Sequence, residues 1–95
     1  MHALPELHDA TLVNVRFDWK ERECVFRLIR VRSGPADLVF SGVSALHIPR
    51  EDAWGHSSSV LELIEAAPGE YEMQMQSGDS IKVVAAACRI EEPVP

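Results

Sequence analysis

Residues 71–85, YEMQMQSGDSIKVVA, alternate apolar and polar side chains on both sides of a turn sequence. Tyr71, Met73 and Met75 alternate with acidic and amide residues, and the alternation resumes at Ile81 after Ser-Gly-Asp. A period of two belongs to a strand with one buried and one solvated face. The segment therefore predicts a β-hairpin, and it indicates an all-β fold for the chain.

The parity of the apolar positions constrains the register of this hairpin. A two-residue loop would pair Met75 with Lys82 and mix the two faces, whereas a three-residue loop at 77–79 pairs Met75 with Ile81. A slip of one residue moves the apolar set of a strand into water, so we expect the three-residue loop. Asp79 would then adopt the left-handed conformation that the third loop position often needs.

A second hairpin is predicted nearer the N-terminus. Residues 10–18 and 23–32 alternate in the same way, and the polar segment between them is short enough to force a four-residue loop. The register that places the apolar residues on one face pairs Phe17 with Cys24, Val15 with Phe26 and Val13 with Leu28. Residues 37–48 are expected to form a third strand with a bulge or bend at Gly42, where the alternation slips.

The segment after the middle of the chain carries helix signals. Ser59 and Glu62 have the spacing of a capping box, and Pro68-Gly69 would end a short helix. One short helix near 59–66 is therefore predicted, with an irregular strand as the alternative. The expected fold is mainly all-β: a single antiparallel meander of about five strands, forming a small sandwich or curled sheet.

Length and charge limit the class of protein. The 95 residues are expected to form a single β domain, 1–95, with a formal net charge of −6. Nucleic-acid binding requires a basic surface, so no nucleic acid is expected, and the acidity favours a basic protein partner. No apolar run approaches the roughly 18 residues of a membrane span, and no signal peptide is recognisable. We therefore expect a cytoplasmic protein without membrane contact.

Two groups of residues suggest catalysis. His8-Asp9 is the adjacent pair found in metal-dependent phosphohydrolases, and His56 could complete a metal site. That chemistry needs further ligands on helices that the sequence does not predict, so we favour Asp9 ordering the start of the first strand.

The serines at 57–59 lack the GxSxG turn of a nucleophile elbow. Cys24 and Cys88 lack a CxxC spacing and are expected to be buried thiols. No catalytic residue, metal or cofactor is expected.

The loop after the middle strand is the predicted binding segment. A tryptophan in a polar, glycine-containing loop either covers an open end of the sandwich or anchors a partner, and we favour the cover. Trp19, in the first loop, has the same two interpretations, and the two indoles would form one apolar patch if they lay together. The candidate interaction residues are Arg50, Trp54, Gly55, His56 and Ser57.

Three short motifs resemble a family of small, uncharacterised bacterial β-proteins. They are Leu7-His8-Asp9-Ala10 before a strand, the 49–59 segment with Trp54-Gly55, and Met75-Gln76-Ser77-Gly78-Asp79. Proteins of this family are similar in size and shape to immunity-like domains of bacterial toxin systems. The resemblance implies a β fold and bacterial origin, and it carries over no catalytic residues.

These observations favour a non-enzymatic cytoplasmic protein-binding domain of the immunity-like kind. A self-associating structural domain, such as a homodimer, is the first alternative. A small metal-dependent enzyme using His8 and Asp9 is the second.

Overall fold

The computed structural model describes residues 2–3 and 7–92. These residues form nine strands and no α-helix, and none of them belongs to a helix that could cross a membrane. The strands are β1 (His2–Ala3), β2 (Thr11–Asp18), β3 (Glu23–Arg30), β4 (Gly34–Ser41), β5 (Ala45–His47), β6 (Val60–Ala67), β7 (Glu70–Met75), β8 (Ser80–Val84) and β9 (Ala87–Glu91).

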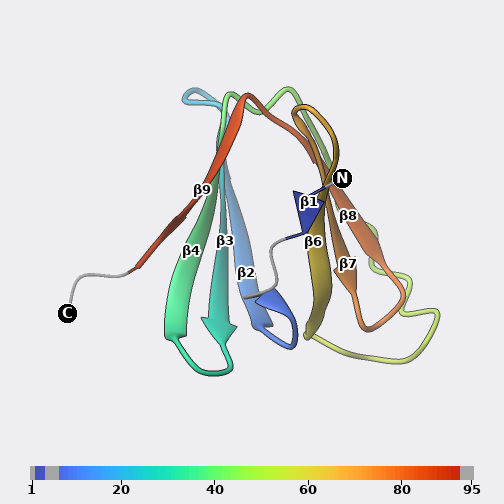
Figure 1. The fold of residues 1–95 in the computed structure, drawn as a ribbon. Helices are drawn as coiled ribbons and strands as arrows, with labels where there is room; N and C mark the ends of the chain where they lie inside the picture. The colour runs from blue at the N-terminus through green and yellow to red at the C-terminus, as the bar shows by residue number, and fades with distance from the viewer. Residues whose placement is uncertain (1, 4–6, 93–95) are drawn as a thin grey trace.

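The strands form two antiparallel sheets whose apolar faces enclose one core (Figure 1). One sheet has the order β2-β3-β4-β9, and the other has the order β1-β6-β7-β8-β5. The predicted small all-β sandwich is confirmed. The single meander of about five strands is wrong, because β5 and β9 each pair with a sheet formed mainly by the other part of the chain.

Aromatic side chains bridge the two sheets at the centre of the core. The ring centroid of Phe40 lies 5.4 Å from that of Phe26 and 5.1 Å from that of Tyr71, and both pairs have edge-to-face geometry. Phe26 comes from β3 and Tyr71 from β7, so Phe40 contacts both layers. Edge-to-face pairs add to the stabilisation that burial of the rings already provides.

The hairpin of β7 and β8 has the predicted parity but a register shifted by two residues. Met73 pairs with Ile81, and the amide of Met75 donates to the carbonyl of Asp79 at 2.8 Å. The three-residue loop is therefore 76–78, not 77–79. The left-handed residue is Gly78, with φ 94°, because glycine adopts that conformation without the steric strain that Asp79 would incur.

The first hairpin has the predicted four-residue loop, with Phe17 opposite Cys24 and Val15 opposite Phe26. A bulge between Leu12 and Asn14 then displaces the third pair, so that Leu12, not Val13, lies opposite Leu28. The bulge leaves the side chain of Val13 52% exposed. The sequence could not reveal it, because the alternation continues through Val13 without interruption.

The chain crosses between the sheets at Gly42, where a bend was expected. Gly42 has φ 65° and separates β4 in one sheet from β5 in the other. The return crossing runs beside it, since the amide of Ala86 donates to the carbonyl of Ser41 at 2.9 Å. The predicted strand 37–48 is therefore two strands in different sheets.

The helix predicted near 59–66 is wrong, because this segment is β6. It pairs with β1 on one side and β7 on the other. Register shifts occur between Val60 and Glu62 and between Glu65 and Ala67. The first shift places the buried residues Val60 and Leu63 three positions apart, which imitates helical spacing.

Candidate functional site

The predicted interaction loop is held by the carboxylate of Asp79, at the end of the β7–β8 turn. Its two oxygens accept hydrogen bonds from the amides of Glu51 and Asp52, at 2.8 and 3.1 Å, and from the hydroxyl of Ser77 at 2.8 Å. The amide of Trp54 donates to the carbonyl of Ser77 at 2.8 Å. The amide of Glu51, followed by the hydroxyl of Ser77, lowers the pKa of Asp79. Three of these four bonds tie the loop to the β7–β8 turn, and the bond from Ser77 holds the Asp79 carboxylate within that turn.

Trp54 is presented to solvent, so the favoured interpretation as a cover for the sandwich is wrong. The residue is 74% exposed. The indole lies against Gly78, where a Cβ would come within 2.9 Å of Trp54 Cδ2. Glycine at this position therefore allows both the left-handed turn and the close approach of the ring.

Asp52 joins the remaining residues of the turn. Its carboxylate accepts from Nε of Arg50 at 3.1 Å and lies 2.7 Å from Nδ1 of His56, while its carbonyl accepts from the amide of Gly55 at 3.0 Å. Four of the five predicted site residues thus lie in one hydrogen-bonded turn. Ser57 is directed elsewhere, since its hydroxyl accepts from the amide of Ser59 at 3.1 Å.

The alternative metal site does not assemble. Within residues 2–3 and 7–92, no three histidine, cysteine, aspartate or glutamate side chains form a group that could hold a metal ion. His8 Nδ1 lies 2.7 Å from the carbonyl of Leu61, and Asp9 accepts from the side-chain amide of Gln76. The Asp9 carboxylate therefore links the first turn to the β7–β8 hairpin, instead of the expected backbone at the start of β2.

The two cysteine thiols are poorly suited to act as nucleophiles. Cys24 and Cys88 lie opposite Phe40 on its two sides, Cys24 buried and Cys88 only partly buried, and both are free. Burial raises the pKa of each thiol to about 11. The nucleophilic thiolate is therefore scarce at neutral pH.

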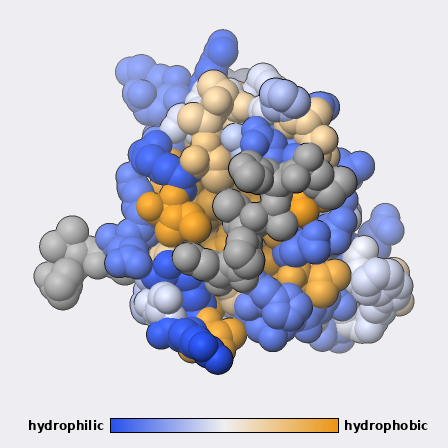
Figure 2. Space-filling view, viewed as in Figure 1, coloured by the Kyte–Doolittle hydropathy of each residue, from blue (hydrophilic) through white to orange (hydrophobic). Residues whose placement is uncertain are grey.

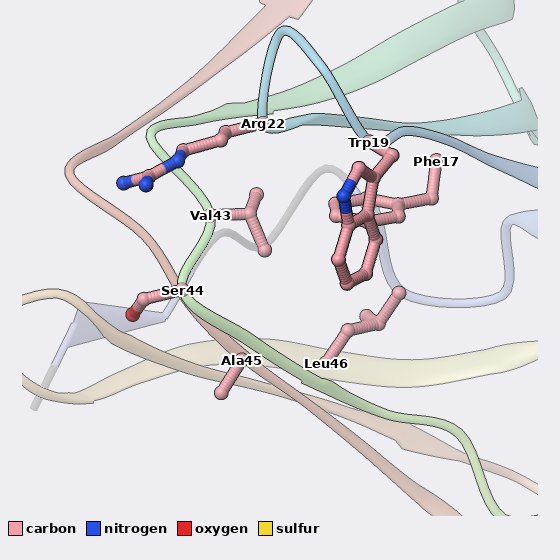
Figure 3. A pocket seen from close by; sticks show the side chains of 7 residues that line it. All are labelled: Phe17, Trp19, Arg22, Val43, Ser44, Ala45 and Leu46. Carbon is pink, nitrogen blue, oxygen red and sulfur yellow. The ribbon is translucent and has the colours of Figure 1, made fainter.

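The structure also contains a cavity that the sequence did not reveal. A hollow of about 550 Å³ lies between the end of β2 and the segment around β5, lined by Phe17, Trp19, Arg22, Val43, Ser44, Ala45 and Leu46 (Figure 3). Trp19 and Phe17 form one end, with ring centroids 5.9 Å apart, and Arg22 lies at the other end beyond Val43. Trp19 is 85% exposed. The crossing at Gly42, which is a tertiary feature, brings residues 43–46 to this position.

A second, smaller hollow of about 320 Å³ continues along β2. Its walls include Val13 and Ile48, which are exposed apolar residues, together with Arg50 and Ser57 of the interaction loop. The two tryptophans therefore lie in different surroundings, Trp19 at the first hollow and Trp54 against Gly78. In the face drawn in Figure 2, several separate hydrophobic patches lie among hydrophilic areas.

Asp79→Asn is expected to loosen the interaction loop, because an amide has one acceptor oxygen where the carboxylate has two. Hydrogen exchange at the amides of Glu51 and Asp52 should accelerate by about tenfold or more. Asp37→Asn, which removes the partner of Arg27 on the β3–β4 pair, is the matched control and should leave exchange at these two amides unchanged. Equal exchange in the Asp79 variant and the wild type would show that the carboxylate does not hold the loop.

The same contact gives a pH dependence with a definite sign. The pKa of Asp79 is lower in the folded protein, so its contribution to stability is complete above the unfolded value of about 3.9. It is lost as the pH falls below that value and passes the lowered pKa. In a Trp19→Phe background, the fluorescence of Trp54 should change in this acidic range, and Asp79→Asn should abolish the change.

Comparison with known proteins bears on the fold alone. No protein-family model and no curated protein matches the chain. The structure is similar to the crystal structure of an uncharacterized protein from Neisseria gonorrhoeae, with a TM-score of 0.59 and 15% sequence identity over 92% of this chain and 93% of that one. At this identity, the similarity shows a shared fold over nearly the full length of both chains, and nothing about function.

Proposed function

We propose that this chain is a non-enzymatic cytoplasmic protein-binding domain of the immunity-like kind, which anchors its partner on the loop that presents Trp54. The observation that carries the proposal is that Trp54, which is 74% exposed, sits on a loop tied to the β7–β8 turn by three hydrogen bonds. Tryptophan is enriched among the residues that dominate binding energy at protein interfaces. A loop already ordered before binding loses little conformational entropy when the partner docks.

Charge supports a basic partner. The chain carries fifteen acidic and nine basic residues, for a formal net charge of −6. A surplus of negative charge accelerates encounter with a basic protein and slows encounter with an acidic one. The 49–59 segment and the two shorter motifs resemble a family of small bacterial β-proteins, which are similar in size and shape to immunity-like domains. This resemblance favours a partner of the toxin class, which such a domain would mask.

The test is capture of a partner from lysate of the source cells, followed by measurement of its affinity after purification. Trp54→Ala should weaken the purified complex by roughly 30- to 1,000-fold, which corresponds to about 2–4 kcal/mol. Val31→Ala is the matched control, since Val31 is 70% exposed but lies in the β3–β4 turn. Circular dichroism should show that both variants are folded.

The other outcomes are also informative. Equal affinity of the wild type and Trp54→Ala would remove the loop from the interface. Recovery of the bait alone, with a dimer in sedimentation, would favour self-association instead. The edge of β2 offers a route for it, because β2 is the terminal strand of its sheet. In an antiparallel β2–β2 pair centred on Phe17, Arg16 of each copy would face Asp18 of the other.

A further inference from the structure

The hollow beside Trp19 combines an apolar end with a cationic end. Leu46 lies beneath the indole of Trp19, and Phe17 meets that indole edge to face. Arg22 occupies the far end and is the one ionisable residue in the lining. A volume of about 550 Å³ is within the range of small-molecule pockets in proteins.

The backbone of Arg22 is held in place, while its charge has no partner among residues 7–92. Its carbonyl accepts from the amide of Val43 at 2.8 Å, and its φ of 53° is in the left-handed region, which a side chain of this size rarely adopts. Among residues 7–92, no side chain forms an ion pair or hydrogen bond with its guanidinium. The backbone thus fixes the position from which the Arg22 side chain extends, and the guanidinium remains available to a ligand.

The smaller hollow along β2 lacks this combination. Its acidic residue, Asp79, already accepts three hydrogen bonds, and its basic residue, Arg50, is paired with Asp52. The first hollow therefore differs from the second in combining, at opposite ends, aromatic side chains and a charge that no described residue pairs.

We propose that the hollow lined by Trp19 and Arg22 binds an aromatic or branched organic acid. The apolar part of the ligand packs against Trp19, Phe17 and Leu46, and its carboxylate pairs with Arg22. A guanidinium can hold a carboxylate by two parallel hydrogen bonds, and the adjoining aromatic rings favour an apolar group over water. The site is independent of the interaction loop and of the proposed function.

The test uses three acids that differ in the spacing between ring and carboxylate: phenylacetate, 4-phenylbutanoate and 6-phenylhexanoate. Binding is followed through the NMR signal of the Trp19 indole N–H. At least one acid should bind with a Kd on the order of 1–10 mM. The primary amide of that acid should bind about fivefold to tenfold more weakly, because it lacks the charge that Arg22 recognises.

Variants separate the two ends of the site. Arg22→Gln should make the best acid and its amide equal in affinity, whereas Arg32→Gln, which changes an exposed arginine of the β3–β4 turn, should preserve the difference. Trp19→Phe, followed through the signals of Leu46, should weaken both compounds to the same extent. The absence of any shift at about 20 mM of all three acids, or equal binding of acid and amide to the wild type, would overturn the proposal.

A final pair of probes distinguishes a free acid from the carboxyl terminus of a polypeptide. The tripeptide Gly-Gly-Phe presents an aromatic side chain and a terminal carboxylate, and its C-terminal amide removes only the charge. Tighter binding of the tripeptide than of any free acid, lost on amidation, assigns the site to a chain terminus. Tighter binding of a free acid assigns it to a small molecule.

Discussion

Replacement of Phe40 by alanine is expected to lower the free energy of unfolding by about 3–5 kcal/mol. Phe40 is 1% exposed and its ring contacts Phe26 in one sheet and Tyr71 in the other. The substitution removes two edge-to-face contacts and leaves a cavity that neither sheet can fill without moving. A loss of this size is a large fraction of the total stability of a small domain, and urea denaturation followed by circular dichroism measures it.

Phe17→Ala is the matched control, because it makes the same chemical change at a ring that is 40% exposed. We expect it to lower the free energy of unfolding by about 1 kcal/mol or less. Similar losses in the two variants would show that the Phe40 ring does not join the layers as described.

Gly42→Ala is expected to lower the free energy of unfolding by about 2–5 kcal/mol, through two separate effects. The φ of 65° strains any residue with a Cβ, at about 1–2 kcal/mol. The added Cβ would also come within 2.8 Å of the Cβ of Ala86, and such overpacking costs about 1–3 kcal/mol. Thermal or urea unfolding of the purified variant measures the sum.

Two further variants separate these effects. Gly34→Ala has a comparable φ of 75° but open space around the new Cβ, so it should show the strain alone. Ala86→Gly, combined with Gly42→Ala, removes the methyl group that would clash. The double variant should therefore regain the part of the free energy of unfolding that Gly42→Ala loses through overpacking. If the double variant is no more stable than the sum of its single effects predicts, the two crossings do not pack as described.

Periodicity predicted the elements whose burial follows strict alternation. Met73, Met75 and Ile81 alternate without interruption, and their common buried face is correct although the loop lies one residue earlier than predicted. Where a bulge changes the phase, the same reasoning fails: Val60 and Leu63 are both buried in β6, but their spacing resembles that of a helix. A bulge leaves no local sequence signal here, since the paired strand determines it.

The part of the candidate site that is contiguous in the sequence could be predicted, and the part formed by distant segments could not. The turn containing Arg50, Trp54, Gly55 and His56 is contiguous in sequence, so its composition marked it in advance. The hollow beside Trp19 was missed because its walls are joined only by the crossing at Gly42. Asp79 was noticed as a turn residue, but its bonds to the loop span more than 25 positions of sequence (27 to Asp52 and 28 to Glu51).

The exchange of strands between the sheets has a consequence for biosynthesis. During translation, the chain emerges from its N-terminus, so β4 is complete before β9, its neighbour in the sheet, has been made. Until residues 87–91 appear, one edge of β4 lacks its partner and can pair with another nascent chain. The long sequence separation of the β4–β9 pairing also slows folding. Among the described strands, β9 is therefore made last, and its pairing with β4 completes that sheet.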